Sequence, residues 1–137
     1  MFTRKQICAA GLFISFFLGY LEWGKDSSAF VYEGFIEVIS NSKGLKSNFT
    51  HPLIVLPLIG EIIFVIGTFN SRLQNKWLVT ALVLTGLLYV MILLAGVLSK
   101  NPKMILSAAP YILFAIGLVI AIRKENRLKK KYIQKHD

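Results

Sequence analysis

One glutamate lies in the middle of a long apolar stretch, residues 52–69, with the sequence PLIVLPLIGEIIFVIGTF. Glu61 has nine residues before it in this stretch and eight after it. A charged carboxylate at the centre of a membrane costs at least ~2.5–3.5 kcal/mol, so acids at that depth are candidates for a functional site. We expect Glu61 to be neutral at pH 7, unless water or a cation from another subunit reaches it.

Three further polar residues are predicted to lie at nearly the same depth as Glu61. Counted at 1.5 Å per residue from the outer end of its stretch, Glu61 is about 13–14 Å deep, and Ser15, Tyr89 and Tyr111 fall in neighbouring layers. A neutral carboxyl both donates and accepts hydrogen bonds, so a tyrosine hydroxyl or a backbone carbonyl could complete them. We predict an intramembrane polar site that either relays protons or cations, or fixes helix packing or meets a basic residue of another protein.

These side chains must be positioned by four apolar segments. Of the 137 residues, 55% are hydrophobic, whereas soluble domains are about 45–50% apolar. A membrane-crossing helix needs ~20 mostly apolar residues, with a range of about 17–25. The first segment lacks a cleavage site with small residues close behind it, so we expect it to remain as a helix. We predict an all-α integral membrane protein in which residues 1–122 form a four-transmembrane-helix bundle, with spans at about 6–21, 52–69, 77–98 and 103–122.

Small residues mark the faces on which these helices are expected to pack. Lipid is as apolar as leucine, so close approach of backbones does much of the work of helix association in membranes. Gly11, Ser15 and Gly19 are each four residues apart and share one helical face, and the second span offers Gly60 and Gly67. We predict that these positions serve helix packing.

The distribution of Lys and Arg predicts the orientation in the membrane. Cytoplasmic segments carry an excess of these residues. With the N-terminus inside, eleven of the sixteen Lys and Arg residues fall on the cytoplasmic side and five on the outer side. We therefore expect a multi-pass protein of the cell membrane with both termini in the cytoplasm.

The loop between the first two spans, residues 22–51, contains a stretch with helical spacing of its apolar residues. Val31, Phe35, Val38 and Ile39 recur at this spacing. We predict a short amphipathic helix at about 28–40 that lies along the outer membrane surface. It either covers the outer end of the bundle or provides a docking surface for a partner.

The segment 123–137 is a basic tail. Seven of the sixteen Lys and Arg residues lie in it, and beside a membrane helix such a run favours anionic lipids or a cytoplasmic partner over nucleic acid. We expect the fourth helix to continue a turn or two past Ile122. The predicted lipid- or partner-binding residues are Arg123, Lys124, Arg127, Lys129, Lys130 and Lys131.

The sequence carries no recognisable catalytic constellation. A single cysteine excludes an internal disulfide, and the two histidines, His51 and His136, lie in a loop and the tail. We therefore expect no catalytic residues, no metal and no cofactor. The favoured hypothesis is a non-catalytic accessory or assembly subunit of a larger membrane complex. The alternative is an oligomeric, proton-coupled transporter or channel that uses Glu61 as its acid.

Overall fold

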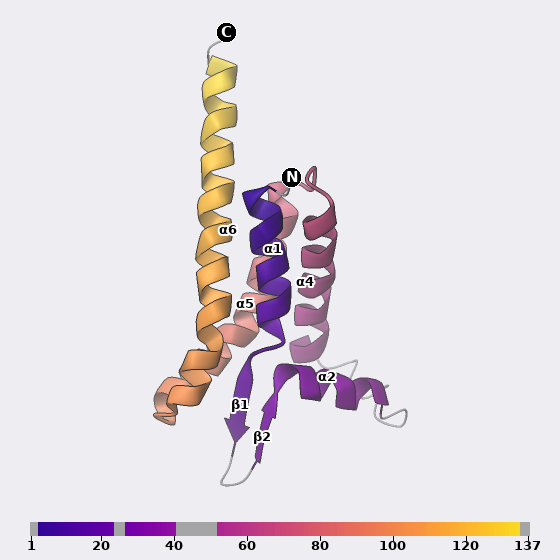
Figure 1. Ribbon diagram of the computed structural model, residues 1–137, viewed down its shortest axis with the longest axis vertical. Helices are drawn as coiled ribbons and strands as arrows, with labels where there is room; N and C mark the ends of the chain where they lie inside the picture. The colour runs from indigo at the N-terminus through magenta and orange to yellow at the C-terminus, as the bar shows by residue number, and fades with distance from the viewer. Residues whose placement is uncertain (1–2, 24–26, 41–51, 135–137) are drawn as a thin grey trace.

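The computed structural model describes residues 3–23, 27–40 and 52–134, and most of these are helical. Figure 1 shows the elements in space. In chain order they are α1 Arg4–Phe16, β1 Tyr20–Trp23, β2 Ser27–Phe30, α2 Val31–Ser40, α4 Pro52–Phe69, α5 Asn75–Leu98 and α6 Pro102–Gln134.

Four of the helices pack side by side. Helix α1 contacts α4 and α6, and α5 contacts the same two helices (Figure 1). Their shared core contains large side chains from each of them, among which Phe16, Phe64, Tyr89 and Leu118 are almost fully buried. The core therefore lies along the axis of the bundle.

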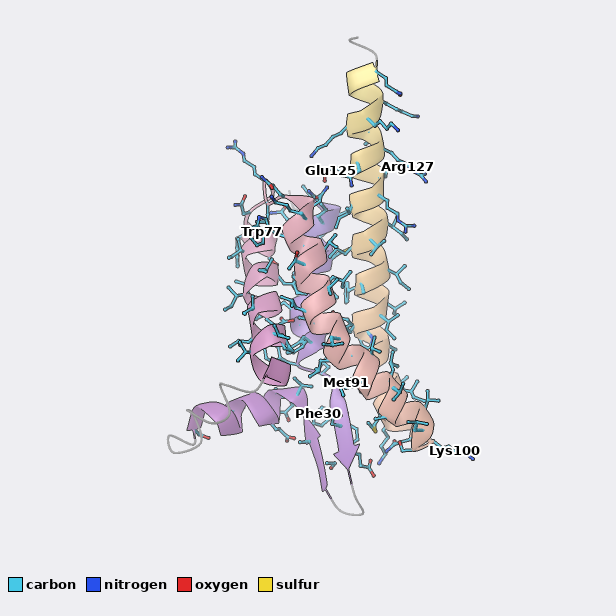
Figure 2. All side chains as sticks on the ribbon, turned by 180° about the vertical axis from the view of Figure 1, so that it is seen from behind. Phe30, Trp77, Met91, Lys100, Glu125 and Arg127 are labelled. Carbon is cyan, nitrogen blue, oxygen red and sulfur yellow. The ribbon has the colours of Figure 1, made fainter. Side chains whose placement is uncertain are left out.

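Two helices of the described part, α5 and α6, are long and apolar enough to cross a membrane. The exposed side chains of both helices are apolar as well: Leu87, Val90 and Leu94 of α5 and Leu113 and Ile120 of α6 are at least half exposed. Figure 2 shows the side chains along these helices. The apolar helix Val55–Phe69 within α4 is shorter, and α1 has 13 residues, below the ~17 that a crossing helix needs.

The all-α prediction is wrong at the end of the first predicted span. Helix α1 ends at Phe16 rather than near residue 21, and β1 and β2 form an antiparallel hairpin in which Tyr20 pairs with Phe30. The two aromatic rings lie 5.2 Å apart, and the Tyr20 N–H donates to the Ser107 hydroxyl at 3.0 Å. Cross-strand aromatic pairing of this kind stabilises a sheet and competes here with a last turn of helix.

Helix α2 begins at Val31, three residues later than the predicted start. Its start is set by Glu33, whose carboxylate accepts the Phe30 N–H at 2.8 Å and so caps the first turn. The Val31 N–H donates to the Gly19 carbonyl at 2.8 Å. This bond ties α2 to the end of α1, and α2 lies across the end of the bundle beside the hairpin (Figure 1).

The opposite end of the bundle carries the start of α1 and a long extension of α6. A capping box starts α1, because Thr3 accepts the Gln6 N–H at 3.4 Å and Gln6 accepts the Thr3 N–H at 2.8 Å. Helix α6 continues to Gln134, about three turns beyond Ile122 rather than the one or two predicted. Figure 1 shows this extension projecting past the other helices.

Candidate functional site

Glu61 is directed into the core by a close contact between α4 and α5. A Cβ added at Gly60 would lie 2.6 Å from the Thr85 methyl group and 3.0 Å from the Ala81 carbonyl oxygen. Only a glycine allows the two backbones to approach so closely. The next residue, Glu61, is consequently buried, with 3% of its surface exposed.

The structure brings the four predicted polar residues together and adds a fifth. Ser15 from α1, Tyr89 from α5 and Tyr111 from α6 are all buried, and Thr85 of α5 joins them. The two tyrosine rings stack with centroids 3.8 Å apart, and Gly60, the residue before Glu61, lies directly against Thr85. The site is therefore a polar layer built from all four packed helices.

The hydroxyl groups of this layer are occupied by one another and by backbone carbonyls. The Tyr89 hydroxyl donates to the Ser15 and Phe16 carbonyls at 2.7 and 3.0 Å. These carbonyls belong to the last turn of α1 and also accept backbone N–H groups of the residues that follow the helix. The Thr85 hydroxyl donates to the Ala81 carbonyl at 2.9 Å and is hydrogen-bonded to Tyr111. With the threonine hydrogen used, Tyr111 is the donor of that bond.

The predicted hydrogen bond between Glu61 and a tyrosine or a carbonyl is wrong for the described part of the chain. Neither carboxyl oxygen of Glu61 has a hydrogen-bond partner there. The physical reason is that both tyrosine hydroxyl hydrogens are already used. Tyr89 donates to carbonyls at the end of α1, and Tyr111 donates to Thr85. Each tyrosine keeps acceptor lone pairs, which the O–H of a protonated carboxyl could use and a carboxylate could not. The layer therefore suits the neutral acid.

The polar layer is bounded by apolar side chains toward the end of the bundle where α1 begins. Leu12, Phe64, Leu78 and Ala81 are at most 2% exposed. Gln6 is the next buried polar side chain in that direction, and it donates to the Thr68 carbonyl at 3.0 Å. Among the described residues, no chain of buried polar side chains connects Glu61 to this end of the bundle.

The small residues predicted to serve packing all lie at close contacts between elements. A Cβ at Gly11 would meet the ring of Phe114. At Gly19 it would lie 2.9 Å from Val31 and 3.0 Å from the Tyr89 hydroxyl, and at Gly67 it would lie 2.7 Å from Leu78. Ser15 sits between them in α1 and donates to the Leu12 carbonyl at 3.2 Å.

The predicted docking surface on α2 is placed only in part. Val31 is 7% exposed and packs on Gly19 instead of facing outward. The side chains of Phe35, Val38 and Ile39 lie outside the described residues. Tyr32 and Ile36 are exposed on the same helix, so the accessible surface of α2 includes residues that the spacing argument did not select.

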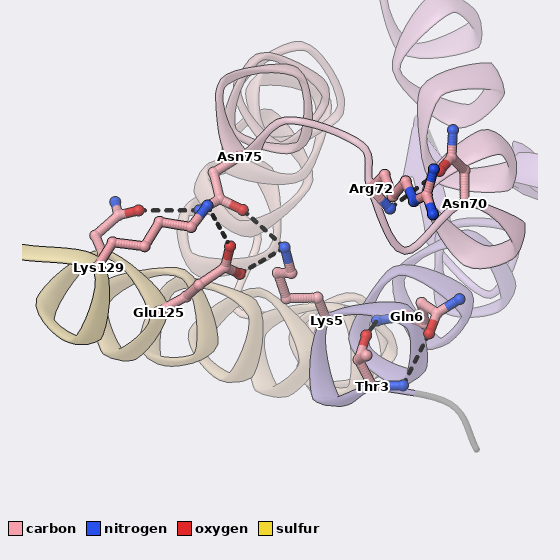
Figure 3. A network of polar contacts seen from close by, with 9 residues as sticks. Thr3, Lys5, Gln6, Asn70, Arg72, Asn75, Glu125 and Lys129 are labelled. Atoms are coloured by element: carbon pink, nitrogen blue, oxygen red, sulfur yellow. Dashed lines mark hydrogen bonds and ion pairs between the residues drawn. The ribbon is translucent and has the colours of Figure 1, made fainter. Parts of the chain in front are cut away.

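The predicted basic residues of the tail are exposed along the extension of α6, and a polar network holds its base (Figure 3). Glu125 forms ion pairs with Lys5 of α1 and, at 2.8 Å, with Lys129. Lys5 also donates to Asn75 of α5 at 3.0 Å, and Asn75 donates to Asn126. Hydrogen bonds from Lys129 and Lys5 lower the pKa of Glu125. Sequence reasoning missed this network because Lys5 and Glu125 are 120 residues apart.

The described residues contain no group of three or more His, Cys, Asp or Glu side chains that could hold a metal ion. No family model, curated protein or solved structure matches the chain. The candidate site consists of the buried carboxyl of Glu61, three hydroxyl-bearing neighbours on two adjacent helices, and the hydroxyl of Ser15.

Proposed function

We propose that this chain is a small multi-pass protein of the cell membrane, with four crossing segments and both termini in the cytoplasm, that acts as a non-catalytic subunit of a larger membrane complex. The lengths of α5 and α6 and the apolar surfaces of the helices support the membrane location.

The observation that carries the subunit assignment is the extension of α6. From Ile122 to Gln134 the helix rises by about 18 Å, and its basic side chains are exposed. Lipid headgroups add only about 5–8 Å beyond the hydrocarbon on each side, whereas Lys129, Lys130 and Lys131 lie about 10–14 Å past Ile122. The extension is mostly charged, with Leu128 half exposed among its basic residues. A mostly polar helix that projects from its own fold is suited to bridge to another protein.

The chemistry of the extension indicates an acidic partner surface. Glu125 is neutralised by Lys5 and Lys129 at the base of the extension, which leaves Lys130 and Lys131 as exposed positive groups farther along. Electrostatic complementarity of this kind mainly sets the association rate and the choice of partner. We therefore expect salt to weaken the complex.

Purification of the full-length tagged chain from its own cells in a mild detergent tests this proposal. The wild type should elute with a larger membrane complex in fixed stoichiometry. Changing Lys129, Lys130 and Lys131 together to Gln should reduce the co-purified complex by at least ~10-fold, since each lysine near an oppositely charged surface is worth about 1 kcal/mol. The matched control, Lys100→Gln with Lys103→Gln at the other end of the bundle, should retain the complex. A homogeneous homo-oligomer with no other subunit would contradict the proposal.

The carboxyl of Glu61, which has no partner in the described part of the chain, favours a second candidate, a proton-linked activity of an oligomer of this chain. A buried carboxyl with no partner binds or releases a proton without breaking a hydrogen bond. Glu61→Gln keeps the size and removes the titratable proton. In proteoliposomes with an enclosed pH dye, the Gln variant should lose proton flux while Glu22→Gln, an exposed control, keeps it. Equal flux in Glu61→Gln and wild type would remove this candidate.

A further inference from the structure

A groove of about 530 Å³ runs between α1 and α6 at the end of the bundle where α1 begins. The end of the groove next to the first turn of α1 is lined by Arg4 and Lys124. From there its walls continue along Ile7 and Ile120 to Cys8 and Gly117. The volume lies in the range of small-molecule sites, about 300–1,000 Å³. The groove is distinct from the Glu61 layer, and none of its lining residues belongs to that layer.

The end of the groove next to the first turn of α1 carries two positive groups, Arg4 and Lys124, that form no ion pair in the described part of the chain. Lys5 is paired with Glu125, but no ion pair or hydrogen bond of the side chain of Arg4 or Lys124 is found among the described residues. The first turn of α1 contains no acid, although a helix N-terminus favours a negative group. Glu125 also lines the groove but is paired with Lys5 and Lys129, so the exposed Arg4 and Lys124 leave a net positive charge there that favours an anion.

The walls of the groove are apolar and open to the surroundings of the bundle. Ile7 and Ile120 are 55% and 60% exposed. From Lys124 down to Gly117 the α6 wall extends about 10 Å, and the absence of a side chain at Gly117 widens it. A Cβ there would lie 3.2 Å from the Cys8 sulfur. The groove therefore combines a cationic mouth near the start of α1 with an apolar wall that continues toward the middle of the bundle.

We propose that this groove binds one anionic phospholipid of the cytoplasmic leaflet, with its phosphate between Arg4 and Lys124 and the start of one acyl chain along Ile7, Ile120 and Gly117. The proposal rests on the membrane location and orientation proposed above. Basic pockets between helices on the cytoplasmic side are recognised sites for anionic headgroups. The bound lipid joins α1 to α6, which the Lys5–Glu125 ion pair also connects nearby.

The only cysteine of the chain, Cys8, gives a direct readout because it lines the groove and is partly exposed. The rate of alkylation of Cys8 by a small neutral thiol reagent is measured on the purified full chain in detergent, with added lipid. Phosphatidylglycerol should slow alkylation in a saturable manner, whereas phosphatidylcholine of the same chain length and inorganic phosphate should not. Equal protection by the two lipids, or protection by phosphate alone, would overturn the proposal.

Variants at the mouth of the groove test the role of charge. Arg4→Gln and Lys124→Gln should each raise the phosphatidylglycerol concentration for half-protection about fivefold, while Arg4→Lys should remain close to wild type. Lys100→Gln, at the far end of the bundle, is the matched control. Unchanged protection in the Arg4→Gln, Lys124→Gln double variant would refute the site. Carbonate extraction of each variant from membranes reports separately on membrane integration, so a failure of the lipid site is distinguishable from a failure of the proposed function.

Discussion

Gln6 and Glu61 lie in two different polar layers of the same bundle, and both are buried, with 7% and 3% of their surfaces exposed. Gln6 accepts the Thr3 N–H and donates to the Thr68 carbonyl, so its amide links two helices. Glu61 has no hydrogen-bond partner in the described part of the chain. Buried polar groups are normally paired, and an exception calls for an explanation other than packing. We infer that Gln6 contributes to stability, whereas Glu61 reduces it and is present for another reason.

The largest effect is expected from breaking the helix contact that buries Glu61. Gly60→Ala places a methyl group 2.6 Å from Thr85 and 3.0 Å from the Ala81 carbonyl, so α4 and α5 must separate. We expect a loss of about 1–3 kcal/mol in the free energy of unfolding, measured by thermal unfolding in detergent. The control is Gly86→Ala, where the nearest atom is the Tyr111 hydroxyl at 3.8 Å. A Gly86→Ala variant as unstable as Gly60→Ala would contradict the assignment.

Two leucine substitutions should shift stability in opposite directions. Gln6→Leu leaves the Thr3 N–H and the Thr68 carbonyl without their partner and should destabilise by about 1–3 kcal/mol. Glu61→Leu removes a buried carboxyl that has no partner among the described residues and should stabilise the isolated chain by about 1 kcal/mol or more. Unfolding of both variants under one set of detergent conditions provides the measurement. Destabilisation by Glu61→Leu would mean that Glu61 has a partner in the protein after all.

A smaller effect on stability should distinguish the two stacked tyrosines, Tyr89 and Tyr111. Tyr89→Phe removes the hydroxyl that bonds the last carbonyls of α1, and a lost hydrogen bond of this type costs about 0.5–1.5 kcal/mol. Tyr111→Phe should cost less, because Thr85 remains bonded to the Ala81 carbonyl. Amide hydrogen exchange near residues 15–19 should rise in Tyr89→Phe only. Equal exchange in the two variants would argue against capping of α1 by Tyr89.

The smallest effect concerns Glu125, a carboxyl that does have partners. Because the hydrogen bonds from Lys129 and Lys5 lower its pKa in the native state, its contribution is complete above its ordinary pKa and is lost as the pH falls through the lowered native value. The Lys129 side chain is 68% exposed, so the contribution should be below about 1 kcal/mol. Glu125→Gln should be slightly less stable than wild type at pH 7, and this difference should shrink as the pH falls through the lowered native pKa of Glu125. A difference that does not change as the pH falls would assign the effect to packing.

The apolar runs of the sequence predict the mostly helical fold well, because long apolar stretches with few polar residues have few alternatives to a helix. Helices α4 and α5 lie close to the predicted stretches 52–69 and 77–98. The early end of α1 was not predictable in this way. It depends on Tyr20 pairing with Phe30 and on Ser107 accepting the Tyr20 N–H, contacts that a count of apolar residues does not contain.

The polar site was predictable in composition but not in bonding. Depth along the spans selects Glu61, Tyr89, Tyr111 and Ser15, since residues at equal depth on neighbouring helices lie in one layer. It does not select Thr85, which has an ordinary place in an apolar helix and becomes important only through its contact with Tyr111. Which hydroxyl bonds which acceptor is decided by competition among all of them, and the sequence does not order these preferences.

The hairpin between α1 and α2 also affects the order in which the chain folds during its synthesis. Its paired residues, from Trp23 with Ser27 to Tyr20 with Phe30, are close in sequence, and hairpins form in about 1–10 μs. A ribosome adds about 5–20 residues per second, so the pairing can be complete before the next residue joins the chain. The end of α1 next to the hairpin is then fixed while α5 has not yet been synthesised, and Tyr89 arrives at carbonyls that already hold their final positions.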